Sequence, residues 1–263
     1  MPSYAVLGAT GNTGQALINV LLQSPDKKVN AFCRSRKKLL RMTPSIADNK
    51  NVTVYEGQLE DVALLAECLR GTCAAFLVVA VPDNMPHCTI AQDTARVAVA
   101  AVTKLRNEGE TVLPKLLPLS SAKLDDHLCR NMPGPMKWIV NHATSNQCKD
   151  LTAAQRFLLQ QPEWISTTFI MPGGLCHDKQ KGHKISMDLQ ETPLSYLDLA
   201  AGMVEVADDR ASGYHMKNVA VVPTSKDVKF PYESLWECVK GLLAHYFPWT
   251  YHYTGAMPMP VRR

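Results

Sequence analysis

Apolar runs of strand length alternate with segments of helical period through the first two thirds of the chain. The runs that predict strands are residues 4–8, 28–34, 52–55, 74–81, 115–120 and 164–171. Apolar positions three to four residues apart predict helices over residues 14–22, 61–69, 89–105 and 151–159. This alternation is typical of βαβ units. We therefore predict an α/β protein with a doubly wound parallel Rossmann sheet of strand order 3-2-1-4-5-6.

Two segments depart from this alternation. Residues 123–136 combine charged side chains with Pro133, Gly134 and Pro135, which predicts a loop over the carboxyl edge of the sheet. Residues 232–253 carry an apolar stripe at helical spacing, formed by Leu235, Trp236, Val239, Leu242, Leu243, Tyr246 and Phe247. We expect this C-terminal helix to pack its stripe on the body of the protein, with a homodimer contact or a membrane-surface contact as alternatives.

Composition and charge narrow the class of protein. The 263 residues are 46% hydrophobic and 20% charged, with a net charge of +4. These values fit one folded domain, and the small, evenly spread charge argues against binding to nucleic acid. The longest uncharged apolar stretch, residues 74–81, is too short to cross a bilayer, so we expect no stable membrane insertion. The N-terminal residues lack the pattern of a secretory signal.

The eight cysteines form no CxxC pair and share no zinc-site spacing with histidines, so we predict no metal site. Free thiols persist in reducing compartments, and we therefore expect a cytoplasmic protein.

The most specific motif is a glycine-rich segment between the first expected strand and the first expected helix. Gly8 permits a tight turn, Gly11 lets a pyrophosphate approach the backbone, and Gly14 lets the helix pack close to the strand. The helix N-terminus then presents free N–H groups to the phosphates. The predicted dinucleotide site is formed by Gly8, Thr10, Gly11, Asn12, Thr13 and Gly14.

Basic residues follow the second expected strand, where an NAD site usually has an acid. Arg34 and Arg36 lie there, and no acid occurs between Lys27 and Met42. Arginine pairs with a 2′-phosphate, whereas an acid binds the ribose 2′-hydroxyl. We therefore predict NADP(H) as the cofactor, with Arg34 and then Arg36 or Lys37 as phosphate ligands.

The motif divides the chain by role. We expect a single NAD(P)-binding Rossmann-type domain over residues 1–263. Residues 1–171 form its cofactor-binding core, and residues 172–263 form a small C-terminal substrate-covering portion that comprises a lid and the C-terminal helix.

Four further motifs accompany the glycine-rich loop and Arg34. They are Tyr-Glu-Gly-Gln-Leu-Glu-Asp at 55–61, Leu-Ser-Ser-Ala at 119–122, Met-Pro-Gly-Gly at 171–174 and Ser-Tyr-Leu-Asp-Leu-Ala at 195–200. Together they resemble atypical short-chain dehydrogenases/reductases of the NmrA-like and biliverdin-reductase-B-like group. The resemblance implies further cofactor contacts from Gln58, Leu59, Ala80, Ser120, Pro172 and Gly173.

A narrower likeness comes from the residues around the loop, from 172–180 and from Phe-Pro-Trp-Thr-Tyr at 247–251. These segments resemble fungal oxidoreductases of the averufin-oxidase-A type. The resemblance implies a small-molecule substrate in fungal secondary metabolism, a polycyclic aromatic polyketide such as a quinone, an anthraquinone or a xanthone.

The proton donor is the least defined part of the expected site. Ordinary short-chain dehydrogenases use Tyr-x-x-x-Lys after the fifth strand, but no tyrosine occurs between Tyr55 and Tyr196. The candidate catalytic residues are therefore Ser121 at the end of the fifth strand, His142 near the missing tyrosine, and His177 after the sixth strand. Lys123 could stabilise a phenolate, but a solvated lysine is the commoner arrangement.

Three hypotheses about function remain open. In the first, NADPH reduces a conjugated acceptor that needs little acid catalysis. In the second, the fold catalyses a redox-neutral ring opening, dehydration or isomerisation with a histidine as acid and base. In the third, the protein is an NmrA-like sensor of NADP that regulates a partner.

Overall fold

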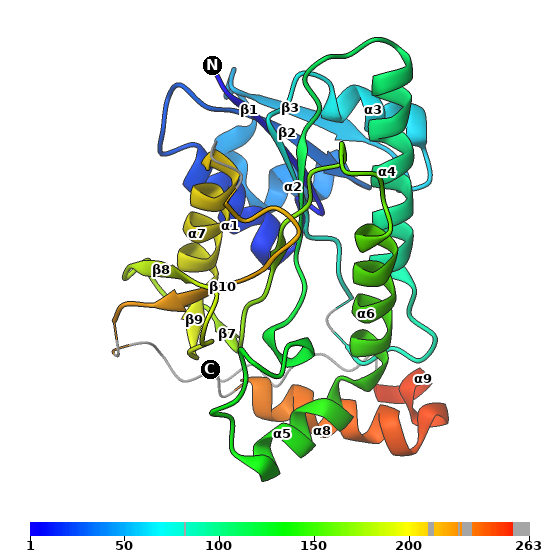
Figure 1. The fold of residues 1–263 in the computed structure, drawn as a ribbon, viewed down its shortest axis with the longest axis vertical. Helices are drawn as coiled ribbons and strands as arrows, with labels where there is room; N and C mark the ends of the chain where they lie inside the picture. The colour runs from blue at the N-terminus through cyan, green and yellow to red at the C-terminus, as the bar shows by residue number, and fades with distance from the viewer. Residues whose placement is uncertain (82, 210–212, 226, 228–232, 255–263) are drawn as a thin grey trace.

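Five parallel strands form the central sheet of the computed structural model, which describes residues 1–81, 83–209, 213–225, 227 and 233–254 (Figure 1). They are β1 (Ser3–Leu7), β2 (Lys28–Cys33), β3 (Val52–Glu56), β4 (Ala74–Leu77) and β5 (Lys115–Pro118), in the order β3-β2-β1-β4-β5. All four residues of β4 are buried, as expected for a strand covered on both faces. The predicted Rossmann sheet is confirmed, although β4 ends four residues earlier than predicted.

The sixth strand is shorter than predicted. Only β6 (Phe169–Ile170) is regular, and it lies beside β5 through isolated bridges at Leu116 and Leu119. The amides of Leu116 and Ser120 donate to Ser166 and Ile170, whereas Pro118 between them has no N–H to donate. The sheet then continues from β6 to β10 (Asn218–Pro223) and to the antiparallel β8 (His183–Ser186).

Helices cover both faces of the sheet (Figure 1). On one face, α1 (Asn12–Leu21) packs against α7 (Tyr196–Asp208). On the other, α3 (Val62–Leu69), α4 (Ile90–Asn107) and α6 (Ser145–Leu159) form a second layer. Each layer has its own apolar core, because β-strand side chains alternate between the two faces. Within the described residues, no helix is long and apolar enough to span a bilayer.

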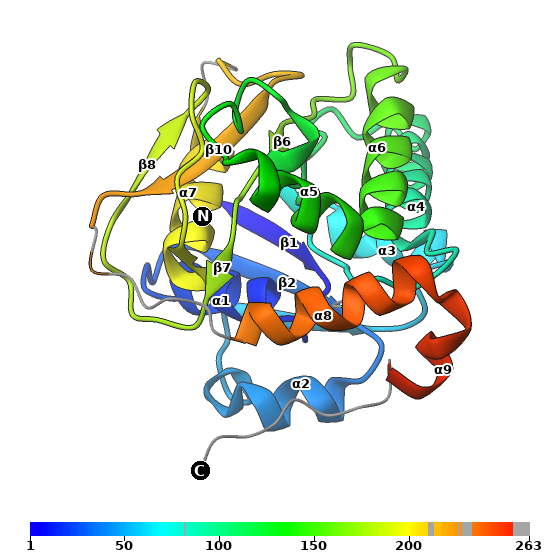
Figure 2. The ribbon, with the colours of Figure 1, turned by 90° about the horizontal axis from the view of Figure 1, so that it is seen from below.

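A helix pair lies at the carboxyl ends of the strands, as the view from below shows (Figure 2). It consists of α5 (Gly134–Ala143) and α8 (Glu233–Tyr246), and α8 continues into η3 (Pro248–Thr250) and α9 (Tyr251–Thr254). The predicted loop 123–136 therefore ends at residue 133, and a 3-10 turn, η2 (Ala122–Leu124), overlaps its start. Pro135 favours this start of α5, because proline is well tolerated in the first helical turn.

The apolar stripe of α8 does not form its buried face, contrary to the prediction. Gly241 and Ala244 are buried, and a Cβ on Gly241 would lie 1.9 Å from the carbonyl oxygen of Ala143 in α5. The two backbones approach so closely that only small residues fit on the face of α8 that contacts α5. The large apolar side chains therefore lie on its other faces, and Leu235 and Phe247 are 57% and 52% exposed. A homodimer through this helix stays a prediction, and residue 232, where the helix was expected to begin, lies outside the described residues.

Candidate active site

The glycine-rich turn connects β1 directly to α1. Gly8 has φ +94°, and a Cβ there would lie 2.8 Å from the carbonyl oxygen of Val78. A Cβ on Gly14 would lie 2.2 Å from the carbonyl oxygen of Gly8, and the amide of Gly11 donates to that same oxygen at 2.9 Å. A side chain at Gly8 or Gly14 would therefore collide with backbone atoms, so the turn requires glycine at both positions.

The N-terminus of α1 fits a pyrophosphate. Its N-cap residue, Gly11, has no side chain to accept a hydrogen bond, and the first turn contains no acidic residue. The first intrahelical bond is donated by the amide of Gln15 to the carbonyl of Gly11. The helix therefore uses none of the amides of Asn12, Thr13 and Gly14, which can bind an anion there.

Arg34 and Arg36 flank the start of α2 (Arg36–Met42), at the carboxyl end of β2. Ser35 caps this helix by accepting a hydrogen bond of 3.2 Å from the amide of Lys38. Both arginines are exposed, and no ion pair to either is recorded within the described residues. Their charges are therefore available to an anionic ligand.

The other residues expected to bind the adenosine follow β3 and β4, at the same carboxyl edge of the sheet as Arg34. The amide of Gly57 donates to the carbonyl of Cys33 at 3.1 Å, which ties the end of β3 to that of β2. Gln58 is exposed and Leu59 is buried, while Ala80 is exposed after β4. This arrangement is compatible with an adenosine lying over the ends of β2, β3 and β4.

Ser120 is held by its backbone, and its side chain faces away from the large pocket described below. Its amide donates to Ile170, and the amide of Ala122 donates to the carbonyl of Pro172 at 2.9 Å. The segments that follow β5 and β6 therefore lie together. The hydroxyl of Ser120 is buried without a hydrogen-bond partner and lines a cavity of about 20 Å³ toward α4 and α6, large enough for one water molecule.

Gly173 contacts a residue that the sequence did not indicate. A Cβ on Gly173 would lie 1.8 Å from Nε2 of Gln190, and that amide nitrogen is buried without a partner. Gln190 therefore covers the backbone beside Pro172. Gln190 is distant from Gly173 along the chain and no motif surrounds it, so local sequence patterns do not indicate this contact.

The three candidate catalytic residues lie in different surroundings. Ser121 is the N-cap of η2, where its side chain makes no capping hydrogen bond. On α5, Nδ1 of His142 lies 2.7 Å from the carbonyl oxygen of Trp138, and the two rings are 4.4 Å apart. The His142 ring also contacts His245 at 4.9 Å, so this histidine belongs to the surface of the α5–α8 pair.

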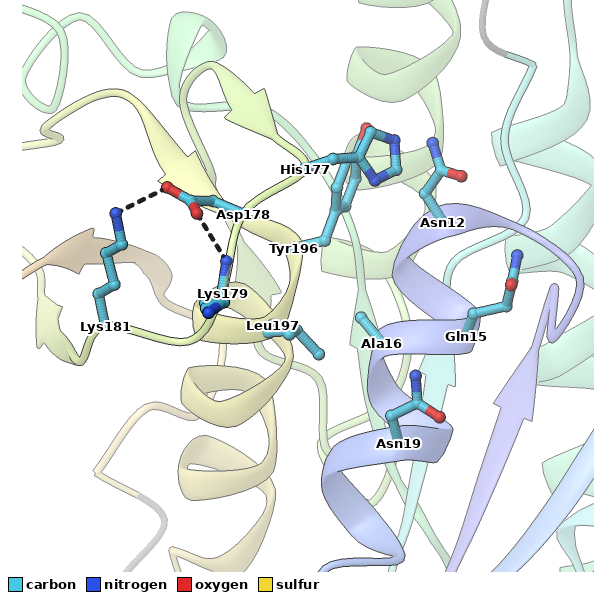
Figure 3. A pocket seen from close by; sticks show the side chains of 10 residues that line it. All are labelled: Asn12, Gln15, Ala16, Asn19, His177, Asp178, Lys179, Lys181, Tyr196 and Leu197. Atoms are coloured by element: carbon cyan, nitrogen blue, oxygen red, sulfur yellow. Dashed lines mark hydrogen bonds and ion pairs between the residues drawn. The ribbon is translucent and has the colours of Figure 1, made fainter. Parts of the chain in front are cut away.

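His177 lines a pocket of about 810 Å³ that begins at the N-terminus of α1 (Figure 3). The lining residues are Asn12, Gln15, Ala16, Asn19, His177, Asp178, Lys179, Lys181, Tyr196 and Leu197. The rings of His177 and Tyr196 face each other with centroids 4.8 Å apart, and the side chain of Asn12 lies opposite them. Neither Ser121 nor His142 is among these residues.

Tyr196 is the functional candidate that sequence reasoning missed. It is the first residue of α7, immediately after the N-cap Ser195. Its place in the Ser-Tyr-Leu-Asp-Leu-Ala motif was a usable signal, but nothing local relates that motif to the phosphate-binding turn. Only the packing of α7 against α1 brings Tyr196 and Asn12 to one pocket.

A buried carboxylate fixes the loop that carries His177. Asp198 is 0% exposed and accepts hydrogen bonds from the amides of Lys181 at 3.0 Å and Gly182 at 2.8 Å. Its second oxygen accepts from the Ser195 hydroxyl at 2.6 Å. The loop after β7 (Leu175–Cys176) is therefore attached to the start of α7, where Tyr196 lies.

Lys123 is not the solvated lysine that its sequence context suggested. Its Nζ donates to Oγ1 of Thr144, between α5 and α6. Burial lowers the pKa of Lys123, and the neighbouring Cys148 partly offsets this effect. No carboxylate ion pair to Lys123 is recorded in the part of the chain that the structure describes.

Comparison with known proteins assigns the family. A family model described as NAD(P)H-binding matches residues 8–210. The oxidoreductase ordB of Dothistroma septosporum is 68% identical over 262 residues, covering 99% of this chain and 98% of the relative. The oxidoreductase aflX of Aspergillus parasiticus is 52% identical over 263 residues, covering 100% and 99%.

A solved structure shares the fold. A short-chain dehydrogenase/reductase from Veillonella parvula in complex with NADP aligns with a TM-score of 0.65 and 18% identity, over 88% of this chain and 99% of that chain. The expected resemblance to short-chain dehydrogenases/reductases and to fungal oxidoreductases is thereby confirmed. The chain belongs to the NAD(P)H-binding family, and it is an oxidoreductase-type enzyme that binds NAD(P)H in a Rossmann-like domain.

Proposed function

We propose that this enzyme uses NADP(H) to reduce a polycyclic aromatic polyketide of the quinone, anthraquinone or xanthone type. One observation carries the proposal: the 810 Å³ pocket joins the phosphate-binding end of α1 to a histidine and a tyrosine. Pockets of about 300–1,000 Å³ take ligands of this size. The names of the relatives, all oxidoreductases, support hydride chemistry.

The preference for NADP(H) rests on Arg34 and Arg36. Both are exposed beside the carboxyl end of β2 and have no recorded carboxylate partner within the described residues. A 2′-phosphate carries the charge that these guanidinium groups match. Bound NADPH supplies a hydride from C4 of its nicotinamide ring.

The residues of the chain then have separate tasks. The free amides at the start of α1 bind the pyrophosphate, and the Pro172–Gly173 backbone orients the nicotinamide side. His177 provides a titratable group in the pocket. Ser121 and His142 remain candidate catalytic residues, although neither lines this pocket.

Turnover by the purified full chain tests the proposal. NADPH is mixed with a hydroxylated anthraquinone, a naphthoquinone or a xanthone, while NADPH absorbance is followed and the products are identified by mass. We expect NADPH consumption matched by one equivalent of reduced product, and slower turnover with NADH. His177→Ala should lower the rate, whereas His252→Ala, on the exposed surface of α9, should not.

Two results would contradict the proposal. Conversion of an aromatic epoxide or hydroxyketone without NADPH consumption would identify a redox-neutral enzyme. Tight NADP binding with no turnover of any acceptor, together with capture of a specific protein partner, would identify a sensor. Unchanged rates in Ser121→Ala and His142→Ala would remove those two residues from the catalytic site.

A further inference from the structure

We propose that Tyr196 is the catalytic proton donor of this enzyme, replacing the tyrosine that is missing from the helix after the fifth strand. The inference rests on the proposed function, because it concerns the oxygen atom of the same aromatic substrate. It assigns the role to a residue from a different element, the start of α7.

The position of Tyr196 in the pocket supports this role. Tyr196 and Asn12 line the same pocket, and Asn12 is the first residue of α1, beside the amides that fit the pyrophosphate. Asn12 lies across the pocket from Tyr196 (Figure 3), so a ligand in this pocket can contact both the start of α1 and the phenol. A proton donor must be within hydrogen-bond reach of the oxygen that it protonates, and among the described residues that line the pocket Tyr196 alone has a phenolic O–H.

The rings of Tyr196 and His177 are held next to each other by the fold. The Tyr196 ring faces the His177 ring at 4.8 Å, with 42° between their planes. Asp198 binds the amides of Lys181 and Gly182, so the loop with His177 and the helix with Tyr196 are held together by one buried carboxylate. The pair is therefore set by the fold before a ligand arrives, as catalysis by preorganised groups requires.

The pocket also contains charged side chains. The titratable groups that line the pocket with Tyr196 are His177, Asp178, Lys179 and Lys181, and Asp178 pairs with Lys181 at 2.9 Å. The imidazole of His177, whose ring centroid lies 4.8 Å from that of Tyr196, can donate or accept a proton beside the phenolate that forms when Tyr196 gives up its proton. Lys181 also pairs with Asp227 at 3.5 Å, so within the described residues Lys179 is the lining lysine without a recorded carboxylate partner.

Reduction of a substrate carbonyl at this site consumes one hydride and one proton. The substrate carbon gains two electrons and one hydrogen as hydride, the carbonyl π bond breaks, and the oxygen forms a new O–H bond with the proton of Tyr196. The products are a hydroxyl group and NADP⁺. The phenolate of Tyr196 then takes a proton from His177, which is exposed and recovers it from solvent.

The test compares three variants of the full chain. Tyr196→Phe removes the hydroxyl and keeps the ring, His177→Gln removes the neighbouring imidazole, and Tyr214→Phe is the matched control, because Tyr214 packs on the core outside the pocket. We expect Tyr196→Phe to lower kcat by about 100-fold or more, with NADPH affinity unchanged. Tyr214→Phe should match the wild type in both measurements.

A second readout needs no cofactor and no turnover. Binding of a hydroxylated anthraquinone, followed by its absorbance change, should weaken about five- to tenfold in Tyr196→Phe, because one hydrogen bond to a substrate oxygen is lost. Thermal unfolding of each variant confirms that it folds. Equal binding in wild type and Tyr196→Phe would overturn the assignment.

The kinetic outcomes distinguish a failure of the proton-donor assignment from a failure of the proposed function. Turnover by the wild type together with an unchanged kcat in Tyr196→Phe would overturn the donor role and leave the proposed function intact. A large loss in His177→Gln but not in Tyr196→Phe would make His177 the donor instead. Absence of NADPH oxidation in the wild type would overturn both.

Discussion

Asp198 accepts a hydrogen bond of 2.8 Å from the amide of Gly182, and this contact attaches the loop after β7 to the first turn of α7. Gly182 has φ +102°, a conformation that L side chains rarely adopt, and a Cβ there would lie 2.4 Å from Oγ1 of Thr224. The carboxylate also accepts from Ser195. In the part of the chain that the structure describes, the recorded partners of this buried carboxylate are neutral donors, two backbone amides and a hydroxyl.

Asp198→Asn should destabilise the protein by about 1–3 kcal/mol, because an amide NH2 would replace an acceptor that faces buried N–H donors. Urea unfolding measures the effect. Asp188→Asn is the matched control: its side chain is 73% exposed in its pair with Arg130, so a change within about 1 kcal/mol is expected. Equal stability of the two variants would show that the Asp198 contacts contribute little.

Gly14→Ala should weaken both the fold and cofactor binding. The new methyl group would lie 2.2 Å from the carbonyl oxygen of Gly8, so α1 must move away from the turn. We expect a loss of about 1–3 kcal/mol in the free energy of unfolding and weaker NADPH binding by calorimetry. Gly134→Ala, where a Cβ meets no atom within 4 Å, serves as control and should leave both unchanged.

Arg34→Ala should reduce the preference for NADPH. Loss of a charge-assisted hydrogen bond costs about 1.5–3 kcal/mol, which raises the NADPH dissociation constant about 10- to 100-fold and leaves that for NADH unchanged. Arg41→Ala, an exposed position at the other end of α2, is the control and should bind both cofactors normally. An equal loss of affinity for NADH and NADPH would show that Arg34 does not bind the 2′-phosphate.

His245 should make the protein less stable in acid. Burial lowers its pKa, as do nearby His142 and Lys149, and its Nδ1 lies 2.7 Å from Oγ of Ser145. The unfolded chain therefore binds this proton first, near pH 6.5, so stability falls as the pH drops from about 6.5 toward the lowered folded pKa.

His245→Gln removes that proton and should lose this part of the pH dependence. Urea unfolding at about pH 8 and about pH 5 measures it, because the two values lie on either side of an ordinary histidine pKa. His252→Gln, exposed on α9, should behave as the wild type. An unchanged pH dependence in His245→Gln would rule out this histidine as the cause.

The sheet and the cofactor turn were predictable because their signals are local. Buried strands such as β4 are short apolar runs, and the turn at Gly8 requires glycine for its own backbone angle. The length of the sixth strand was overestimated, because the apolar pattern of residues 164–171 does not show how many hydrogen bonds the neighbouring strand β5 can form with it. Pro118 on β5 removes the donor that would have completed the ladder.

The environments of side chains were predicted less well. Lys123 is shielded from solvent because Thr144, Cys148 of α6 and Cys238 of α8 lie near it. These residues are distant in sequence, so the residues next to Lys123 do not indicate its burial. The stripe of α8 suggested an inward apolar face, but Gly241 allows the backbone of α5 to approach so closely that the small-residue face lies inside.

Sequence alone is enough to predict the alternation of strands and helices, the glycine turn at Gly8 and the basic residues after β2, since each depends on backbone preferences or residue types within a few positions. The tertiary structure decided which side chains share a pocket. Tyr196 and Asn12 meet only because α7 packs against α1 on one face of the sheet, and Asp198 holds the His177 loop beside them. Such contacts depend on packing between distant segments, which local sequence patterns do not encode.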